Sequence, residues 1–380
     1  MTSLTVGVLR ESADGEQRVG LVPADVHRLT ELGLAVLVES GAGTAAWHVD
    51  GAYAVAGAET ADRASLLRRA SVVVCVRPPE HEVVAALRPG QVVVGLLGLR
   101  GCPDHLAALA GRGVTAVSFD GLPRTVSRGQ TMDALTSQAN VAGYRAALVA
   151  GNLFGRLMPM QMTATGTSRP ARVLVLGAGV AGLQAIGTAR RLGAVVTGYD
   201  VRPSAREEIR SLGAAVADIG ETFGGADAGG YARPLSAAEQ QALPEALATH
   251  VARSDIVITT AQVPGRTPPL LVSDEAIKAM GPGSVIVDLA ATATGGNVAV
   301  SRADETLVTD NGVTVVGAPD LAASVPGSAS EAYSRNVCAL LHHLVADGEV
   351  HIDPADEIHA GVVFIRAGEI LQPSTQDTNS

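Results

Sequence analysis

Three glycines spaced as Gly-x-Gly-x-x-Gly are the residues of this 380-residue chain with the clearest chemical meaning. They directly follow the apolar run 173–176 and precede a helical pattern from Leu183 to Leu192. In such a strand–turn–helix, the glycines permit a tight turn, close backbone approach to a pyrophosphate, and close packing of helix on strand. The helix start adds unpaired N–H groups and a positive dipole end. The spacing therefore predicts a dinucleotide site formed by Gly177, Ala178, Gly179, Val180, Ala181 and Gly182.

An acidic residue at the end of the next apolar strand predicts which dinucleotide binds. Asp200 follows the run 194–199 and lies eighteen residues after Gly182. A carboxylate there accepts hydrogen bonds from an adenosine ribose and repels a 2′-phosphate. Arg202, two residues later, by itself argues for a 2′-phosphate, but Asp200 is better placed at the strand end. The sequence therefore favours NAD(H) over NADP(H).

The sequence offers no clear general base to accompany a hydride transfer. An alcohol or amine substrate needs such a base, which is usually a histidine or a carboxylate. The nine histidines fall in helical, loop or terminal stretches, where a surface or core role is the simpler interpretation. The loop after Asp288 carries no ionisable side chain before Gly295.

A polar cluster precedes a long helical pattern that starts at Ala134. It contains Arg124, Arg128, Gln130 and Asp133, and Thr136 follows in the first helical turn. Capping of the helix explains part of this cluster, because aspartate is favoured at helix starts. Alternatively, an arginine or glutamine together with an aspartate satisfies the donors and acceptor of a nicotinamide carboxamide.

The composition limits the class of protein. The formal net charge of −10, without a cluster of Lys and Arg, argues against a nucleic-acid partner. Alanine, valine, leucine and glycine are abundant, as in parallel α/β proteins whose sheets are covered on both faces. The three cysteines form no CxxC pair, so we expect reduced thiols and a cytoplasmic location. No leader peptide and no run long enough to span a bilayer is recognisable.

The pattern along the chain predicts an α/β fold of two Rossmann-like domains with parallel sheets, separated by a cleft. The first domain comprises residues 1–135 and 330–380, and the second comprises 136–329 with its connecting helix. The segment 163–169 reads as a loop, and the run 362–365 as a last strand returned to the first domain. The glycine-rich segment 221–230, which leads to Tyr231, reads either as a loop that closes over the site or as an unstructured insertion. Apolar runs predict strands at 5–9, 35–38, 71–76, 91–96, 114–118, 173–176, 194–199, 255–259, 285–289 and 313–316.

Several of these segments together resemble one known family. The resemblance is to the NAD(H)-binding component of proton-translocating NAD(P) transhydrogenase, within the alanine dehydrogenase/transhydrogenase superfamily. Its motifs are distributed over most of the chain. They lie at 123–144, 156–160, 177–182, 199–203, 229–232, 259–266, 288–291 and 295–297.

The resemblance implies a soluble subunit that exchanges a hydride directly with NADP(H) held on a partner subunit. A membrane-spanning subunit of the family couples this exchange to proton translocation, and the NAD(H)-binding component is usually a homodimer. This implies a cytoplasmic protein held at the inner face of the plasma membrane by its partners. The implied catalytic residues are Arg124, Gln130, Asp133, Thr136 and Tyr231. The implied cofactor-binding residues beyond the glycine turn are Asp200, Val201, Arg202, Gly230 and Gln262.

Two other functions stay open as alternatives. The segment 16–19 resembles the N-terminal motif of alanine dehydrogenases, and Arg18 matches their substrate-carboxylate arginine. Arg77 stands where that family has a lysine, Gly98 where it has a histidine, and the segment 292–294 lacks its aspartate. These departures argue against amino-acid dehydrogenation. The third possibility is an NAD(H)-binding module without turnover.

The chain also departs from the transhydrogenase pattern. The stretch from Arg124 to Gln130 is one residue longer than usual, so Arg128 is the alternative candidate for the nicotinamide contact. One further residue is inserted between Asp288 and Gly295, and the segment 99–102 lacks the aromatic side chains of the family. These differences affect the expected ring geometry more than the nucleotide site.

Overall fold

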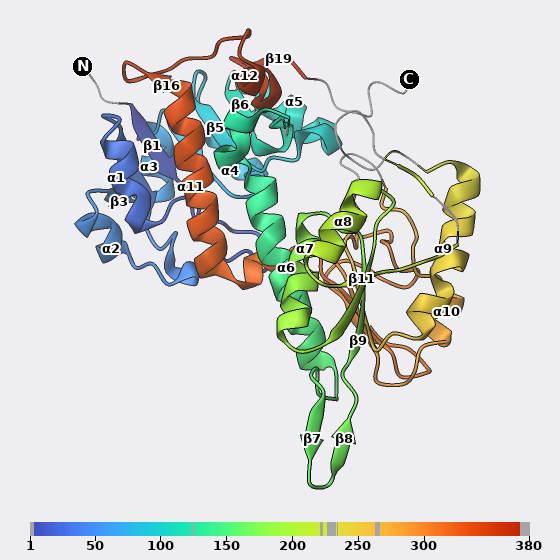
Figure 1. Ribbon diagram of the computed structural model, residues 1–380. Coiled ribbons are helices and arrows are strands. Elements are labelled where there is room, and N and C mark those ends of the chain that lie inside the picture. The colour runs from blue at the N-terminus through green and yellow to red at the C-terminus, as the bar shows by residue number, and fades with distance from the viewer. Residues whose placement is uncertain are drawn as a thin grey trace. The chain divides into compact units, whose positions relative to one another are not determined.

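The computed structural model describes residues 4–123, 125–220, 223–225, 233, 235–262 and 267–372 (Figure 1). The chain forms two compact units. Unit 1 comprises Met1–Gln138 and Ala323–Ser380, and unit 2 comprises Ala139–Ala322. Each contains one predominantly parallel sheet with helices on both faces, as the apolar strands predicted.

The sheet of unit 1 has the order β19-β18-β6-β5-β4-β1-β2-β3. Its parallel strands have the sequence order 6-5-4-1-2-3, which is the doubly wound arrangement. The expectation that the C-terminal segment returns to this unit is confirmed, because β18 pairs antiparallel with β6. The strands are β1 (Thr5–Val8), β2 (Ala35–Glu39), β3 (Glu59–Ala61), β4 (Val72–Val74), β5 (Val92–Gly95), β6 (Thr115–Ser118), β18 (Val363–Arg366) and β19 (Glu369–Ile370).

Side chains alternate between the two faces of this sheet, so each face has its own apolar core. On one face Val6 and Val74 pack in a cluster with Tyr333 of α11. On the other, Leu37 and Val73 pack with residues of α3, α4 and α5. The helices of the unit are α1 (Val26–Thr30), α2 (Asp50–Val55), α3 (Arg63–Arg69), α4 (His81–Ala86), α5 (Pro103–Gly111), α11 (Pro326–Leu344) and α12 (Glu357–Val362).

The sheet of unit 2 has the order β11-β10-β9-β12-β13-β15-β14. Its parallel strands follow the order 3-2-1-4-5-6, so β9 lies where the winding direction reverses. Among the described strands of this sheet, β14 alone runs antiparallel, to β15. The strands are β9 (Arg172–Leu176), β10 (Val195–Tyr199), β11 (Ala215–Val216), β12 (Ile256–Thr259), β13 (Val285–Asp288), β14 (Thr306–Val308) and β15 (Thr314–Gly317).

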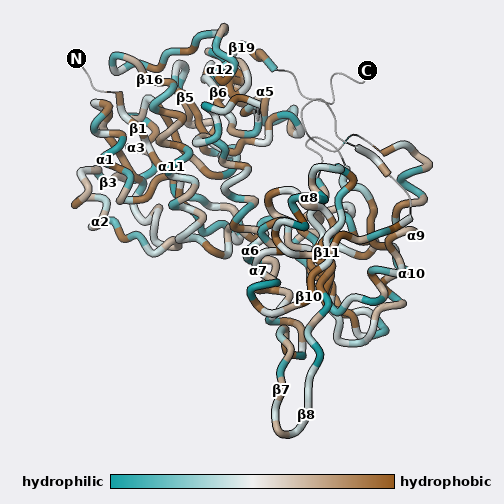
Figure 2. The backbone as a smooth tube through the Cα atoms, viewed as in Figure 1, coloured by the Kyte–Doolittle hydropathy of each residue, from teal (hydrophilic) through white to brown (hydrophobic). Residues whose placement is uncertain are grey.

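The sheet of unit 2 consists largely of hydrophobic residues, which give the brown tube segments around β10 (Figure 2). Val173 and Val175 pack in a cluster with alanines of α6 and α7. Leu174 and Leu176 face the opposite way and join leucines of α9. The helices are α7 (Val180–Arg191), α8 (Pro203–Ser211), α9 (Ala237–Ala252) and α10 (Asp274–Lys278), while α6 (Ala134–Leu153) runs from one unit into the other.

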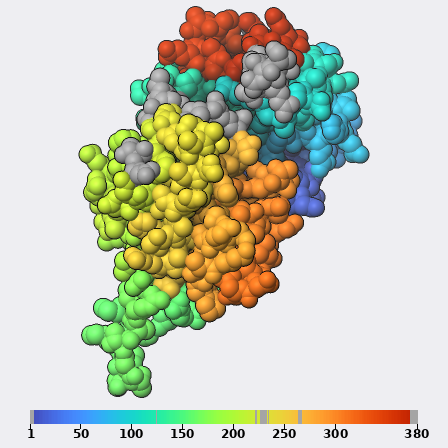
Figure 3. All heavy atoms as spheres, turned by 90° about the vertical axis from the view of Figure 1, so that its right-hand side faces the viewer, coloured from blue at the N-terminus to red at the C-terminus, as the bar shows by residue number. Residues whose placement is uncertain are grey.

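The expectation of a loop at 163–169 is wrong. Strands β7 (Gln161–Thr163) and β8 (Gly166–Ser168) form an antiparallel hairpin there, with Thr163 paired to Gly166 across a two-residue turn. The hairpin stands out from the rest of unit 2 (Figure 3). Both strands are exposed along their whole length, so they show no inward-facing apolar positions that would mark them as strands.

The long helical pattern that starts at Ala134 forms α6, which ends at Leu153. No helix in the described part of the chain is long and apolar enough to cross a membrane.

Candidate functional site

The glycine turn of unit 2 has the geometry that its spacing predicted. Gly177 adopts a φ of +95°, and its N–H donates a hydrogen bond to the carbonyl of Tyr199 at 2.8 Å. A Cβ atom on Gly182 would lie 1.8 Å from the carbonyl oxygen of Gly177. Two of the three glycines are therefore required by the turn and by the packing of α7 on β9.

Gly179 is not required by the turn or by packing, and its place in the motif has a different consequence. A Cβ atom placed on this exposed residue would meet nothing within 4 Å, so the backbone faces open space. Helix α7 starts immediately afterwards at Val180, and Gly179 supplies no side-chain cap. The first N–H groups of α7 lack partners within the helix and carry the positive end of its dipole. This open helix start fits a pyrophosphate.

The turn is held in place by residues of neighbouring strands that the sequence had not identified as site residues. The Thr260 hydroxyl donates to the carbonyl of Gly177 at 3.0 Å. The buried Asn297 side chain accepts from the N–H of Ala261 at 2.9 Å and donates to its carbonyl at 3.0 Å. Thr260 follows β12, which pairs with β9. The polar residues that follow this strand in the sequence were the signal that could have identified these supporting residues.

Gln262 and Asp288 lie on the same edge of the sheet. The exposed Gln262 donates from Nε2 to the carbonyl of Leu289 at 2.8 Å. Asp288 is fully buried, and its Oδ1 accepts from the Thr259 hydroxyl at 2.8 Å and from the Ala290 N–H at 2.9 Å. Burial raises the pKa of this carboxyl above its usual range. Asp288 therefore supports the loop that Gln262 contacts.

Asp200 lies next to the glycine turn, but it already has partners within the chain. One oxygen accepts the Ala178 N–H at 2.8 Å, and the carboxylate forms an ion pair with Arg202. In the sequence, Asp200 favours NAD(H) whereas Arg202 by itself argues for a 2′-phosphate. In the structure these two residues are paired with each other. Val201, between them, packs against the apolar cluster that contains Tyr199.

Among the described residues of unit 1, those predicted to contact the nicotinamide lie around the start of α6. Asp133 accepts from the Thr136 N–H at 2.8 Å and from its hydroxyl at 2.6 Å. The helix-capping interpretation is therefore confirmed. Gln130 lies exposed in the short 3-10 helix Ser127–Met132 just before this cap. Arg128 donates to Oδ2 of Asp356 at 3.1 Å, so this alternative arginine is bound within unit 1.

Arg124, Gly230 and Tyr231 lie outside the described residues. The remaining predicted residues form two described groups, one in each unit: Gln130, Asp133 and Thr136 in unit 1, and the glycine turn with Asp200, Val201, Arg202 and Gln262 in unit 2.

Arg18, the residue that suggested an amino-acid substrate, is paired within unit 1. Its Nε and Nη2 donate to the two carboxylate oxygens of Glu16, at 2.8 and 2.6 Å. Its Nη1 donates to Gln138 at 2.9 Å, and Arg77 donates to Glu16 at 2.8 Å. Burial would raise the pKa of Glu16, but its contacts with Arg18 and Arg77 outweigh burial and lower this pKa to about 2. The charge of Arg18 is therefore compensated before any ligand arrives.

One group among the described residues has the types and proximity of metal ligands. His343, Asp356 and His359 offer atoms within 4.8 Å of one another. However, Nδ1 of His359 accepts the N–H of Asp353 at 3.0 Å. A neutral ring in this arrangement carries its proton on Nε2, which removes the lone pair that a metal needs. The group therefore does not fit a three-ligand metal site.

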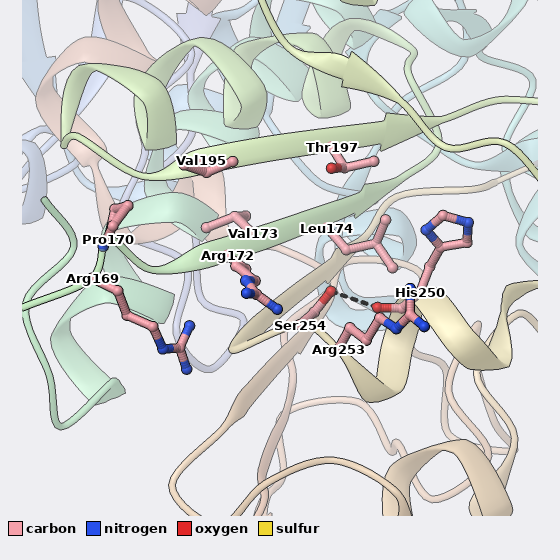
Figure 4. Close-up of a pocket in the computed structure, with 10 residues that line it drawn as sticks. All are labelled: Arg169, Pro170, Arg172, Val173, Leu174, Val195, Thr197, His250, Arg253 and Ser254. Atoms are coloured by element: carbon pink, nitrogen blue, oxygen red, sulfur yellow. Dashed lines mark hydrogen bonds between the residues drawn. The ribbon is translucent and has the colours of Figure 1, made fainter. Parts of the chain in front are cut away.

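A cavity of about 400 Å³ lies elsewhere in unit 2 (Figure 4). Its lining includes Arg172 and Val195, the first residues of β9 and β10, and Arg253 beyond the end of α9. The glycine turn and Asp200 follow the opposite, carboxyl ends of the same two strands. This cavity is therefore separate from the dinucleotide turn.

Comparisons with known proteins agree with this geometry. The family model "Alanine dehydrogenase/PNT, N-terminal domain" matches residues 7–142, and the corresponding C-terminal domain model matches residues 146–373. NAD(P) transhydrogenase subunit alpha of Cereibacter sphaeroides is 42% identical over 375 residues, which cover 97% of this chain and 71% of that protein. In Rhodospirillum rubrum, the first part of NAD(P) transhydrogenase subunit alpha is 39% identical over 381 residues, covering 98% of both chains.

Two solved structures show the same fold. A transhydrogenase from Sinorhizobium meliloti matches with a TM-score of 0.84 at 37% identity, covering 97% of this chain and 99% of that one. An L-alanine dehydrogenase matches with a TM-score of 0.80 at 24% identity, covering 99% of both chains.

Proposed function

The chain belongs to the alanine dehydrogenase/PNT family, and from this premise we propose that it is the NAD(H)-binding subunit of a proton-translocating NAD(P) transhydrogenase. In this proposal NADP(H) is held on a partner subunit, and a membrane-spanning subunit couples hydride exchange to proton translocation. The chain then resides in the cytoplasm, held at the inner face of the plasma membrane by these partners. The open helix start behind Gly179 is the observation that carries the assignment of NAD(H) binding.

The residues of the glycine turn bind and fix the phosphate end of the dinucleotide. Gly179 leaves the approach open, and the N–H groups of Val180 and the next residues face it. Thr260 and Asn297 hold the turn and the neighbouring loop rigid through the contacts described above. When bound, NAD(H) supplies the hydride chemistry that no side chain provides.

We assign the orientation of the nicotinamide to Gln130, Asp133 and Thr136, with Arg124 and Tyr231. The capping contacts fix the Asp133 carboxylate on a rigid helix start, and the exposed Gln130 amide offers both donors and an acceptor. Exchange of a hydride between two nicotinamides releases no substrate proton. The site therefore needs orientation and water exclusion, and it does not need an acid–base pair.

The pairing of Arg18 favours this function over amino-acid dehydrogenation. A substrate carboxylate would have to replace Glu16 at a guanidinium that is only 4% exposed. Removing one partner of a buried ion pair costs roughly 3–5 kcal/mol. This cost would apply here, because the displaced Glu16 would lose its ion pair with Arg18. Arg77 also pairs with Glu16, and a guanidinium is in general a poor base.

The test is to mix the purified chain with a validated NADP(H)-binding subunit, NADP⁺ and NADH deuterated at C4 of the nicotinamide, and to measure transfer of the label to NADPH by mass spectrometry. We expect exchange only when both proteins are present. As a control, the chain alone is incubated with NAD⁺ and L-alanine, and we expect no NADH to form. Absence of exchange with an active partner would refute the proposal, whereas steady NADH production from alanine would establish the dehydrogenase alternative.

A further inference from the structure

The carboxylate of Asp200 is enclosed by the side chain of one neighbouring arginine and by two backbone N–H groups. Its Oδ1 accepts from the backbone N–H of Arg202 at 2.8 Å and from Nε at 3.0 Å. Its Oδ2 accepts from the Ala178 N–H at 2.8 Å and from Nη2 of Arg202 at 3.1 Å. Both oxygens thus have two partners, and Asp200 is only 7% exposed.

The backbone of Arg202 explains why this pair forms. Arg202 is in an extended conformation immediately before Pro203, which starts α8. A guanidinium group presents parallel N–H donors that match a carboxylate in two-point contact. This contact with Asp200 raises the pKa of Arg202, which therefore stays charged. Nη2 also reaches the carbonyl of Ala178 at 3.3 Å, so the arginine spans the side of the glycine turn.

The pair changes the electrostatic argument about cofactor choice. An isolated aspartate at this strand end repels a 2′-phosphate. Here the adjacent guanidinium offsets that charge, because the ion pair as a whole is close to neutral. A 2′-phosphate is therefore opposed because Asp200 already occupies the N–H donors of Arg202 that would otherwise bind it.

Building on the proposed NAD(H) binding, we propose that Arg202 is a specificity-determining residue, and that Asp200 excludes NADP(H) chiefly by holding the Arg202 guanidinium. Without the carboxylate, Nε and Nη2 of Arg202 have no acidic partner at position 200, beside the glycine turn where we place the adenosine ribose. Two-point contacts with phosphate are among the strongest that arginine makes. Replacing Asp200 alone then converts this end of the site into a 2′-phosphate site.

The Asp200→Asn substitution tests this directly. An asparagine oxygen still accepts the Ala178 N–H, so the turn keeps that bond while the negative charge is removed. We expect the affinity for NADPH to rise at least about tenfold, since one hydrogen bond to a charged group is worth ~1.5 kcal/mol or more. We expect NADH to bind several-fold more weakly, because the ribose loses an ionised acceptor. Both dissociation constants are measured from the fluorescence of the reduced nicotinamide.

The double variant Asp200→Asn/Arg202→Ala separates this idea from simple loss of negative charge. We expect it to lose the gain in NADPH affinity completely. A matched control is Asp200→Asn/Arg210→Ala, which removes an exposed arginine from helix α8, the helix that follows Arg202, and should keep the gain. Asp200→Ser, which keeps a short acceptor, serves as a second single variant if the asparagine variant does not fold.

Three results decide the proposal. If the single variant binds NADH but gains no affinity for NADPH, the proposal is wrong. It is equally wrong if the double variant with Arg202→Ala keeps the gain, because repulsion by Asp200 alone would then explain specificity. If the unmodified chain binds no NADH at all, the proposed function fails first, and that outcome is visible before any variant is compared.

Discussion

Asp133 combines a structural role with a proposed functional one. Its carboxylate accepts both the N–H and the hydroxyl of Thr136, which fixes the start of α6. The same contacts hold the carboxylate in one orientation. A group that positions a nicotinamide has to be held in this way. Substitution at this residue should therefore affect both stability and turnover, and the two effects have to be separated.

We predict that Asp133→Ala slows hydride exchange with the partner subunit at least about tenfold, because misplacing reacting atoms by ~1 Å is at least that costly. NADH affinity should change much less, since the adenosine half binds at the glycine turn. Loss of the cap should lower the free energy of unfolding by ~1 kcal/mol.

The matched control for this prediction is Asp62→Ala. Asp62 caps α3 in the same unit by accepting the Ser65 N–H at 2.8 Å. It should lose similar stability and keep full exchange activity. Equal losses of activity in both variants, or unchanged exchange in Asp133→Ala, would remove Asp133 from the site and favour a binding module without turnover.

Glu11 gives unit 1 a dependence on pH. Burial raises the pKa of its carboxyl from 4.5 to about 7, against the backbone N–H donors of Val76 and Arg77. Between these two values the folded chain binds more protons than the unfolded chain, so stability falls as the pH rises. Glu16, whose pKa is about 2, acts in the opposite direction and only below about pH 4.5.

We predict that Glu11→Gln removes this dependence. A pKa difference between 4.5 and about 7 corresponds to roughly 2–3 kcal/mol of unfolding free energy between pH 5 and pH 8. Urea unfolding at several pH values should show wild-type stability falling relative to the variant over this range. The control is Glu82→Gln at an exposed position of α4. Parallel profiles for wild type and Glu11→Gln would contradict the prediction.

At the scale of elements, close approach of backbones determines where helices α6 and α7 lie. A Cβ on Gly143 of α6 would lie 2.0 Å from the carbonyl oxygen of Ala181, just as one on Gly182 would collide with Gly177. Gly143 lies inside α6, where glycine is a poor helix former. In the structure it permits the contact between α6 and the start of α7.

We predict that Gly182→Ala weakens NADH binding at least about tenfold and lowers the free energy of unfolding by several kcal/mol. The new methyl group would have to move the turn, and displacements in a packed backbone are expensive. Gly187→Ala, in the same helix and with open space at its Cβ, should leave binding unchanged and gain ~0.5–1 kcal/mol of stability. Calorimetric titration with NADH and thermal unfolding distinguish the two. Normal NADH affinity in Gly182→Ala would disprove the assigned role of the turn.

At the scale of the whole molecule, we propose that the exposed hairpin β7–β8 packs against a second copy of this chain. Met162 is 75% exposed and Met160 is 60% exposed. An isolated two-stranded hairpin is marginally stable in water, so packing against a second chain would stabilise it. The family resemblance implies that this second chain is another copy of the same protein.

We predict that Met160→Ser/Met162→Ser shifts the chain from dimer to monomer in sedimentation equilibrium at micromolar concentration. Val308→Ser, which changes an equally exposed apolar residue on the edge strand β14, should leave the dimer intact. A double variant that remains dimeric would exclude the hairpin from the interface.

Most of the architecture followed from local patterns. Runs of buried residues marked the parallel strands because each is covered on both faces, and the glycine spacing located the turn. The hairpin was missed because all of its residues are exposed and show no such pattern. Short strands such as β3 and β14 were missed as well, since three residues carry too little periodicity.

The amino-acid sequence alone determined the fold class, the position of the glycine turn and the family, because these depend on periodicity and on backbone geometry that is local in the chain. Only the tertiary structure decided which charges compensate one another. Arg18 donates a hydrogen bond to Gln138, which lies 120 residues later in the sequence. The Asp200 carboxylate accepts from the Ala178 N–H and pairs with the Arg202 guanidinium. Pairings of this kind depend on where folded elements place side chains, and residue type and spacing do not specify that placement.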